Sequence, residues 1–251
     1  MSEAPAPTPV EPETTRVRLQ EKPVKPYATY LLAALLGILF IAQEISRTQT
    51  GTDILFIMLG KINTLILRGE VWRFITPALL HGSLYHLGFN LYALYVLGTR
   101  IEPIYGHGRF LTLFLLGAFG GNVLSFVLSK SPSLGSSTAI FGLLGAEVAF
   151  LIYNRQLFGR ESKAMLSNLA FILVLNLMIG IMPGLNIDIW GHAGGLAAGF
   201  IFGALAGPRW AIRRSDLGLQ IVDTRTKRDL WIGAGMVFIA FAAMALIPFM
   251  G

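Results

Sequence analysis

Apolar residues occur in seven blocks along the chain, and short polar or charged segments separate the blocks. Each block is about 20 residues long, which is the length that an α-helix needs to cross a bilayer. The pattern predicts transmembrane helices at residues 27–46, 84–103, 109–129, 137–154, 166–183, 190–207 and 229–250. Apolar residues make up 54% of the 251-residue chain and charged residues 14%. The expected fold class is therefore an all-α polytopic membrane protein.

The segments outside the first six blocks differ in composition. Residues 1–26 hold six prolines among Glu and Thr and lack the apolar core of a signal peptide, so we expect a disordered cytoplasmic tail. Residues 27–208 form the expected six-helix core, and 209–228 a basic cytoplasmic linker. The last segment, 229–251, contains no ionisable residue after Asp229, and we expect an accessory seventh helix with no chemistry of its own.

Basic residues are distributed unevenly between the two sides of the membrane. With the N-terminus inside, fifteen Lys and Arg lie in cytoplasmic segments and five on the opposite face. Lys and Arg accumulate on the cytoplasmic side of membrane proteins, so the N-terminus is expected inside and the C-terminus outside. The net charge of +6 thus indicates orientation rather than a nucleic-acid partner. The composition fits a prokaryotic plasma membrane, and an organelle membrane is the alternative.

Cysteine is absent and only four histidines are present. Disulfides and thiolate zinc sites are therefore excluded, and the spacing of the histidines shows no metal signature. We expect neither a metal nor an organic cofactor.

The unusual polar residues of the second, fourth and sixth predicted helices lie near the outer end of each. His86 and Asn90 are one helical turn apart, three hydroxyls stand at 136–138, and His192 opens the sixth helix. Each has an ordinary structural interpretation, as a helix cap, an interhelical histidine or a packing amide. Polar groups in membrane helices are costly and usually face an internal cavity. Together they provide the parts of a nucleophile, a base and an oxyanion hole.

Two observations leave this chemistry open. Glycines in the fourth and sixth helices indicate close backbone approach, which is ordinary membrane packing. Intramembrane His and Asn also line the paths of channels and transporters. A channel predicts polar residues through the whole depth, whereas the fourth helix has none between Thr138 and Glu147.

The order of these residues resembles the rhomboid family of intramembrane serine proteases over residues 27–208. The family's Gly-x-x-Trp-Arg, then His, then His-x-x-x-Asn, is matched in the first loop and second helix by Gly69, Trp72, Arg73, His81, His86 and Asn90. Its Gly-x-Ser and His-x-x-Gly-x-x-x-Gly are matched by Gly135, Ser137, His192, Gly195 and Gly199. The resemblance implies an endopeptidase that cleaves transmembrane segments of membrane proteins near the outer leaflet, with transmembrane protein substrates and the lipid bilayer as partners.

The resemblance also implies roles. Ser137 would be the nucleophile, and His192 the general base that later donates to the leaving amine. His86, Asn90 and the Ser137 backbone N–H would form the oxyanion hole. Supporting roles would fall to Gly135, Phe141, Trp72, Arg73, His81, Gly195 and Gly199. The alternative is a catalytically inactive relative that binds membrane clients, although such relatives generally lose the Ser or the His.

Two positions depart from the family's usual pattern, and a third carries an acid near His192. Thr138 stands where the family usually has Gly, and Phe141 where many members have Tyr; a Phe ring stacks on His192 but donates no hydrogen bond. Asp188, four residues before His192, suggests a triad. The family's catalytic pair works without an acid, so we assign Asp188 no catalytic role.

Overall fold

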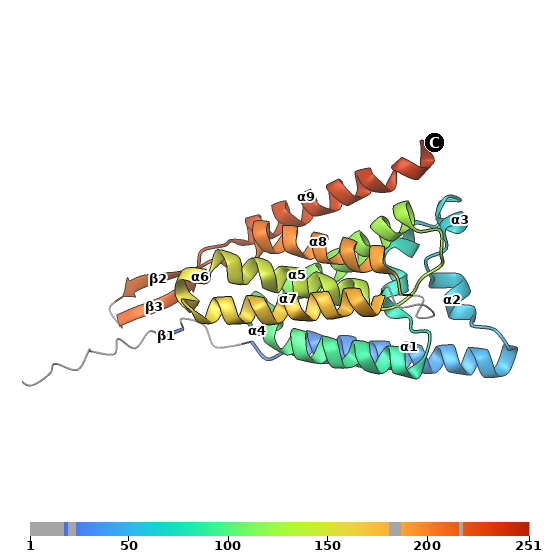
Figure 1. The fold of residues 1–251 in the computed structure, drawn as a ribbon, viewed down its shortest axis with the longest axis horizontal. Coiled ribbons are helices and arrows are strands. Elements are labelled where there is room, and N and C mark those ends of the chain that lie inside the picture. Colours follow the sequence, from blue (N-terminus) through green and yellow to red (C-terminus); the bar gives the residue numbers. More distant parts are fainter. Residues whose placement is uncertain (1–17, 20–23, 181–186, 216–217, 251) are drawn as a thin grey trace, which may run out of the picture.

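Helices dominate the computed structural model, which describes residues 18–19, 24–180, 187–215 and 218–250 (Figure 1). The longer helices are α1 (Tyr27–Thr50), α4 (Leu84–Leu128), α5 (Ser137–Tyr153), α7 (Glu161–Gly180), α8 (Ile189–Ala206) and α9 (Lys227–Ala245). The shorter ones are α2 (Ile54–Leu59), α3 (Asn63–Ile66), α6 (Arg155–Phe158) and the 3₁₀ helices η1 (Val71–Phe74), η2 (Thr76–Leu79) and η3 (Ile247–Phe249).

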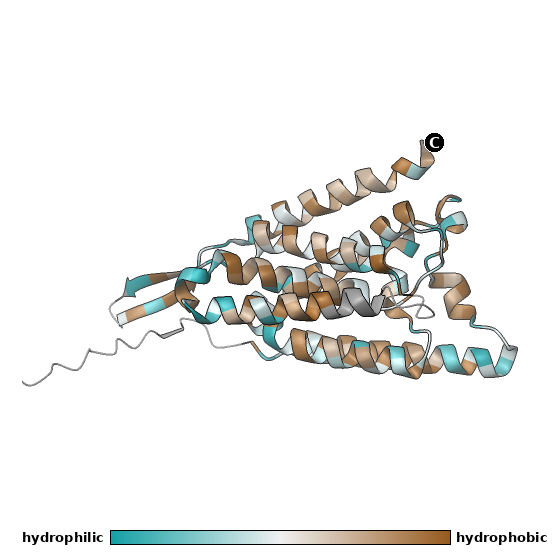
Figure 2. Ribbon diagram, in the orientation of Figure 1, coloured by the Kyte–Doolittle hydropathy of each residue, from teal (hydrophilic) through white to brown (hydrophobic). Residues whose placement is uncertain are grey.

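The helices follow the predicted spans closely. Four described helical segments are long and apolar enough to cross a membrane, namely α1, α4, α8 and the run of α9 with η3, while α5 is apolar but shorter. Helix α7 starts before the predicted span 166–183, whose last three residues lie outside the described residues. The chain is an integral, multi-pass membrane protein. Figure 2 shows apolar colour along the helices and hydrophilic colour at both ends of the molecule, at the hairpin and α6 and at the last turns of α1.

The predicted spans 84–103 and 109–129 both lie within α4. Its backbone leaves helical geometry at Gly106, where φ is 74° and ψ is 159°. A side chain is disfavoured at that positive φ, so glycine suits the reversal between the two spans. Just before it, the fully buried carboxylate of Glu102 accepts hydrogen bonds from the Ala28 and Thr29 N–H groups. This carboxylate fixes the start of α1 to α4 just before the kink at Gly106.

Helices α4, α5 and α8 pack through glycines at the centre of the molecule. A Cβ added to Gly199 of α8 would overlap the Gly142 carbonyl of α5, and one added to Gly195 would overlap the Thr138 carbonyl. The backbones of α5 and α8 are therefore in direct contact, as small residues permit in membrane helices. This contact sets the distance between the first turns of the two helices.

The loop between α1 and α4 is held by polar contacts to backbone carbonyls. Arg73 is 2% exposed and donates to the carbonyls of Gly60 and Ile57, at 2.6 and 2.7 Å, where α2 ends. The half-exposed Trp72 donates from Nε1 to the Met58 carbonyl at 3.2 Å. Trp72 and Arg73 thus organise the loop and lie away from Ser137.

The segment 209–228, predicted only as a basic linker, contains a β-hairpin. Strands β2 (Trp210–Ser215) and β3 (Gly218–Asp223) pair antiparallel, with Trp210 opposite Asp223. Strand β1 (Arg18–Leu19) runs parallel to β3 and lies in the tail predicted to be disordered; residues 1–17 and 20–23 lie outside the described residues. Trp210 packs edge-on against Phe150 of α5, with ring centroids 5.0 Å apart, which anchors the hairpin to the helices.

Helix α9 packs on the outside of α4 and α8. The Phe238 ring stacks on Phe119 of α4 at 4.9 Å, and Gly233 lies against Ala206 of α8. Thr226 and Asp229 cap the start of α9 reciprocally. None of these contacts involves Ser137 or His192.

Candidate active site

Ser137 and His192 face each other from the first turns of α5 and α8. Ser137 Oγ lies 2.9 Å from His192 Nε2, which is hydrogen-bond distance. The two residues are 55 positions apart in sequence, and the glycine contact between α5 and α8 brings them together. Helix capping needs no such contact, so the geometry is that of a nucleophile beside a base.

Phe141 lies one turn after Ser137 and covers the histidine ring. The Phe141 and His192 rings are stacked, with centroids 4.2 Å apart and an interplanar angle of 12°. The stacked ring limits rotation of the imidazole without providing a hydrogen bond.

His86 approaches the serine from the start of α4, through a gap that Gly135 leaves. Gly135 has φ of 132°, and a Cβ there would lie 2.7 Å from His86 Cε1. That Cβ would also lie 3.6 Å from Ser137 Oγ, so the His86 ring, Gly135 and the serine hydroxyl share one small volume. A larger residue at 135 would displace the ring.

Asn90 is buried and lies one turn below His86. Its Nδ2 donates to the His86 carbonyl at 2.9 Å, a bond within α4. An amide nitrogen has a second N–H, so this bond leaves one donor for another acceptor.

Ser136 has a different partner from Ser137. Its Oγ lies 3.1 Å from Nε2 of His81, and both residues are fully buried. The backbone N–H of His81 donates to Oε1 of Gln43 on α1, at 2.9 Å. Burial lowers the pKa of the His81 imidazole to about 3, so the ring is neutral near pH 7. The uncharged pair of His81 and Ser136 thus connects the first loop to the start of α5.

Thr138 fits in place of the family's usual glycine because two neighbouring helices lack side chains. Its Cβ and Cγ2 lie where a Cβ of Gly121 would be, and Cγ2 also lies against Gly191. The methyl group therefore fills space between α4 and α8, on a different side from Ser137 Oγ and His192.

The Asp188 carboxylate forms hydrogen bonds with groups other than the histidine ring. Its Oδ1 accepts from the Gly191 N–H at 2.8 Å, and its Oδ2 accepts from the Ser125 hydroxyl at 2.5 Å. The carboxylate thus caps α8. The hydrogen bonds of the described residues place it on backbone and serine, and not on His192 as a triad acid.

Three residues near the site were not predicted from sequence, namely Lys61, Ser125 and Gln43. The Lys61 ammonium is fully buried, and burial lowers its pKa to about 8 although the Asp188 carboxylate opposes the change. A lysine directly after the apolar run at 54–60 was the available signal. Ser125 and Gln43 are ordinary residues of their helices, and only the tertiary contacts distinguish them.

An apolar pocket of about 210 Å³ borders His192. Its described lining residues are Phe141, Leu173, Val174, Ile189, His192, Ala193 and Leu196. These residues come from α5, α7 and α8, so an apolar side chain at this position would touch one face of the histidine. No group of three or more His, Cys, Asp and Glu side chains is placed for a metal within the described part of the chain.

Comparisons with known proteins agree with the fold. The model of the Rhomboid domain matches residues 68–209, which is more than half of the chain. Rhomboid protease GluP of Bacillus subtilis (strain 168) is 43% identical over 183 residues, covering 73% of this chain and 35% of that protein. RHOMBOID-like protein 1 of Arabidopsis thaliana is 31% identical over 197 residues, covering 74% and 50% of the two chains.

A third relative, Rhomboid-like protease 1 of Toxoplasma gondii, is 37% identical over 146 residues, covering 56% of this chain and 49% of that protein. The alignments thus span about a third to a half of the length of these relatives. The matched region contains His86, Asn90, Ser137 and His192. The chain belongs to the rhomboid family.

Proposed function

We propose that the protein is an intramembrane serine endopeptidase in which Ser137 is the nucleophile and His192 the general base. The observation that carries this proposal is the 2.9 Å separation of Ser137 Oγ and His192 Nε2. The names of the relatives support it, since two of them are called rhomboid proteases.

The reaction follows from the positions of the two side chains. His192 Nε2 takes the hydroxyl proton as Ser137 Oγ attacks the scissile carbonyl carbon, and the carbonyl oxygen becomes an oxyanion. The Ser137 backbone N–H and the side chains of His86 and Asn90 stabilise that charge. His192 then gives the proton to the leaving amine, and water releases the acyl group from Ser137 by the same two steps.

The substrates are transmembrane segments of other proteins. Both catalytic residues lie in the first turns of helices that start at the same end of the molecule as the first loop, and that end faces outward if the basic residues are cytoplasmic. The apolar pocket beside His192 suits an apolar side chain of such a segment. Cleavage therefore occurs toward the outer leaflet.

The experiment combines purified full-length protein in detergent with a model transmembrane substrate and a fluorophosphonate. Ser137 displaces fluoride from the probe and becomes phosphonylated, and mass spectrometry locates the modified residue. Cleavage with modification at Ser137 is expected. Binding of the substrate without cleavage or modification would instead favour the inactive, client-binding relative.

Replacing Ser136 by alanine is expected to preserve most activity and to lower stability. Successive helical residues point about 100° apart, and Ser136 Oγ is bonded to His81 rather than to His192. Its loss leaves His81 Nε2 buried without that partner, at a cost of about 1–3 kcal/mol in the free energy of unfolding. Turnover and thermal unfolding of the variant test both parts; a loss of turnover equal to that of Ser137→Ala would move the nucleophile to Ser136.

Replacing Asn90 by alanine is expected to lower kcat by up to about a hundredfold while KM changes little. An oxyanion donor acts on charge that develops only in the transition state, so substrate binding does not depend on it. Initial rates over a range of substrate concentrations separate the two constants. A change confined to KM would assign Asn90 to substrate docking.

A further inference from the structure

The carboxylate of Asp188 joins the start of α8 to α4. It accepts from the Gly191 N–H at 2.8 Å and from the Ser125 hydroxyl, near the end of α4, at 2.5 Å. His192 follows Gly191 directly, and its own N–H donates to the Asp188 backbone carbonyl at 3.0 Å. The backbone that carries the imidazole is thus held on both sides by one residue, in the turn where His192 stands.

The buried ammonium of Lys61 holds the same end of α4. The three carbonyls that accept from Nζ belong to Ser125, Ser129 and Ser131, at 3.2, 3.0 and 2.9 Å. The ammonium is close enough to Asp188 for the two charges to attract each other. The carboxylate of Asp188 is partly buried, and the opposite charge together with two hydrogen bonds compensates for its partial loss of water.

The backbone of Lys61 extends this connection to the loop before the nucleophile. Lys61 N–H donates to the Ser133 carbonyl at 3.0 Å, and Ser133 N–H donates to the Lys61 carbonyl at 3.1 Å. Ser133 is four residues before Ser137. One cluster therefore restrains both the serine loop and the histidine turn.

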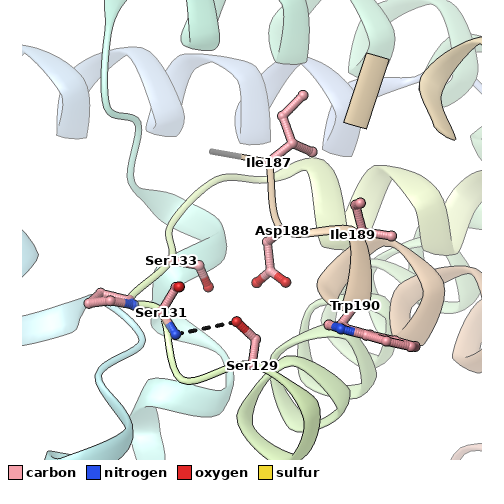
Figure 3. A pocket seen from close by; sticks show the side chains of 8 residues that line it. Ser129, Ser131, Ser133, Ile187, Asp188, Ile189 and Trp190 are labelled. Carbon is pink, nitrogen blue, oxygen red and sulfur yellow. Dashed lines mark hydrogen bonds between the residues drawn. The ribbon is translucent and has the colours of Figure 1, made fainter. Parts of the chain in front are cut away.

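Figure 3 shows the Asp188 carboxylate between the serine loop and the start of α8, facing a cavity of about 550 Å³. Ser129, Ser131 and Ser133 line the opposite wall, and Trp190 lies beside the carboxylate on α8. Among the described lining residues, the wall opposite Asp188 carries three hydroxyls and Pro132. Beside this cavity, the Asp188 carboxylate connects the start of α8 to α4 through the Ser125 hydroxyl.

We propose that Asp188 is a positioning residue for His192, which holds the histidine turn against Ser125 of α4 and so keeps the imidazole in line with Ser137. The role rests on the proposed catalytic pair. It differs from that of a triad acid, because both carboxylate oxygens are bonded to groups other than the imidazole.

The test uses full-length protein in detergent with the variants Asp188→Ala, Asp188→Asn and Ser125→Ala. Alanine removes both bonds, and a displaced base is expected to lower kcat by about tenfold or more with little change in KM. Asparagine retains both, since its oxygen accepts from Gly191 N–H and its NH₂ donates to Ser125 Oγ. Asp188→Asn is therefore expected to recover most of kcat, and Asp188→Ala with Ser125→Ala to be no slower than Asp188→Ala alone.

Fluorophosphonate labelling separates positioning from folding. The final extent of labelling counts folded sites, whereas the labelling rate reports activation of Ser137. Asp188→Ala is expected to label slowly to the wild-type extent. Thr226→Ala is the matched control, because it removes a helix cap on α9 away from the catalytic pair and should leave the rate unchanged.

Four outcomes would overturn the proposal. They are an unchanged kcat in Asp188→Ala, an effect on KM alone, a loss of labelling extent without a loss of rate, and Asp188→Asn as slow as Asp188→Ala at full labelling extent. The last would assign Asp188 an action through its charge. If wild-type protein neither cleaves nor labels at Ser137, the proposed catalytic pair itself fails and this inference with it.

Discussion

Replacing Ser137 by alanine will reduce kcat for substrate cleavage by at least about a thousandfold. The methyl group of alanine cannot attack the carbonyl carbon, so no acyl intermediate forms. The oxyanion donors remain, but the oxyanion of the serine reaction does not arise. Folding should be preserved, because the bond that is lost joins Ser137 Oγ to His192 Nε2 and does not carry the packing of α5 on α8. The measurement is cleavage of a model transmembrane substrate by equal amounts of folded wild-type and variant protein.

Ser136→Ala is the control for this result. The two serines are adjacent and both lie at the start of α5, so the two variants differ only in which hydroxyl is removed. Thermal unfolding of both variants establishes that each is folded. Cleavage retained in Ser137→Ala would show that another residue is the nucleophile, and the geometry of Ser137 and His192 would then represent helix capping and packing.

The positions of the long helices were predictable because their physical cause is local. A membrane helix must contain about 20 apolar residues in succession, and this requirement is visible in sequence without knowledge of any contact. The predicted start at residue 84 and the predicted end at residue 129 agree with α4 to within one residue. The break in helical geometry at Gly106 falls between the two predicted spans, as the separate blocks of apolar residues require.

The hairpin of β2 and β3 could not be predicted from pattern alone. Its strands are six residues each, with two Arg in β2 and none in β3, and they lie in a segment that composition marks only as basic. What stabilises it is tertiary. The Trp210 ring packs on Phe150, and the backbone N–H of Trp210 donates to Asn154 Oδ1 at 2.7 Å. These contacts depend on helices that are far away in sequence.

The site divides in the same way. Depth and motif order placed Ser137 and His192 on facing helices, because each lies at a definite distance from the start of an apolar block. The contact of Ser136 with His81 could not be predicted from sequence. His81 lies in a loop whose path depends on the hydrogen bonds of Arg73 to α2. The bond of Asn90 to His86 is local, but sequence does not determine which way an amide points.

The contact between α5 and α8 provides the second large effect. Replacing Gly199 by alanine is expected to destabilise the protein by about 1–3 kcal/mol or more, because the new Cβ overlaps the Gly142 carbonyl, which is backbone and cannot rotate away. The helices must separate, and Ser137 and His192 stand on the two helices that separate. We therefore expect a lower midpoint of thermal unfolding together with a loss of cleavage of about a hundredfold, the order that a displacement of about 1 Å produces.

Gly37→Ala in α1 is the matched control, because a Cβ at Gly37 meets nothing within 4 Å. Alanine is favoured over glycine within helices by about 1 kcal/mol, so this variant should be as stable as wild type or slightly more stable. The comparison separates the helical preference, which is common to both substitutions, from the overlap, which only Gly199→Ala introduces. If both variants unfold at the same temperature and cleave at the wild-type rate, the close backbone contact does not hold the two catalytic turns together, and their alignment must depend instead on the polar cluster around Asp188 and Lys61.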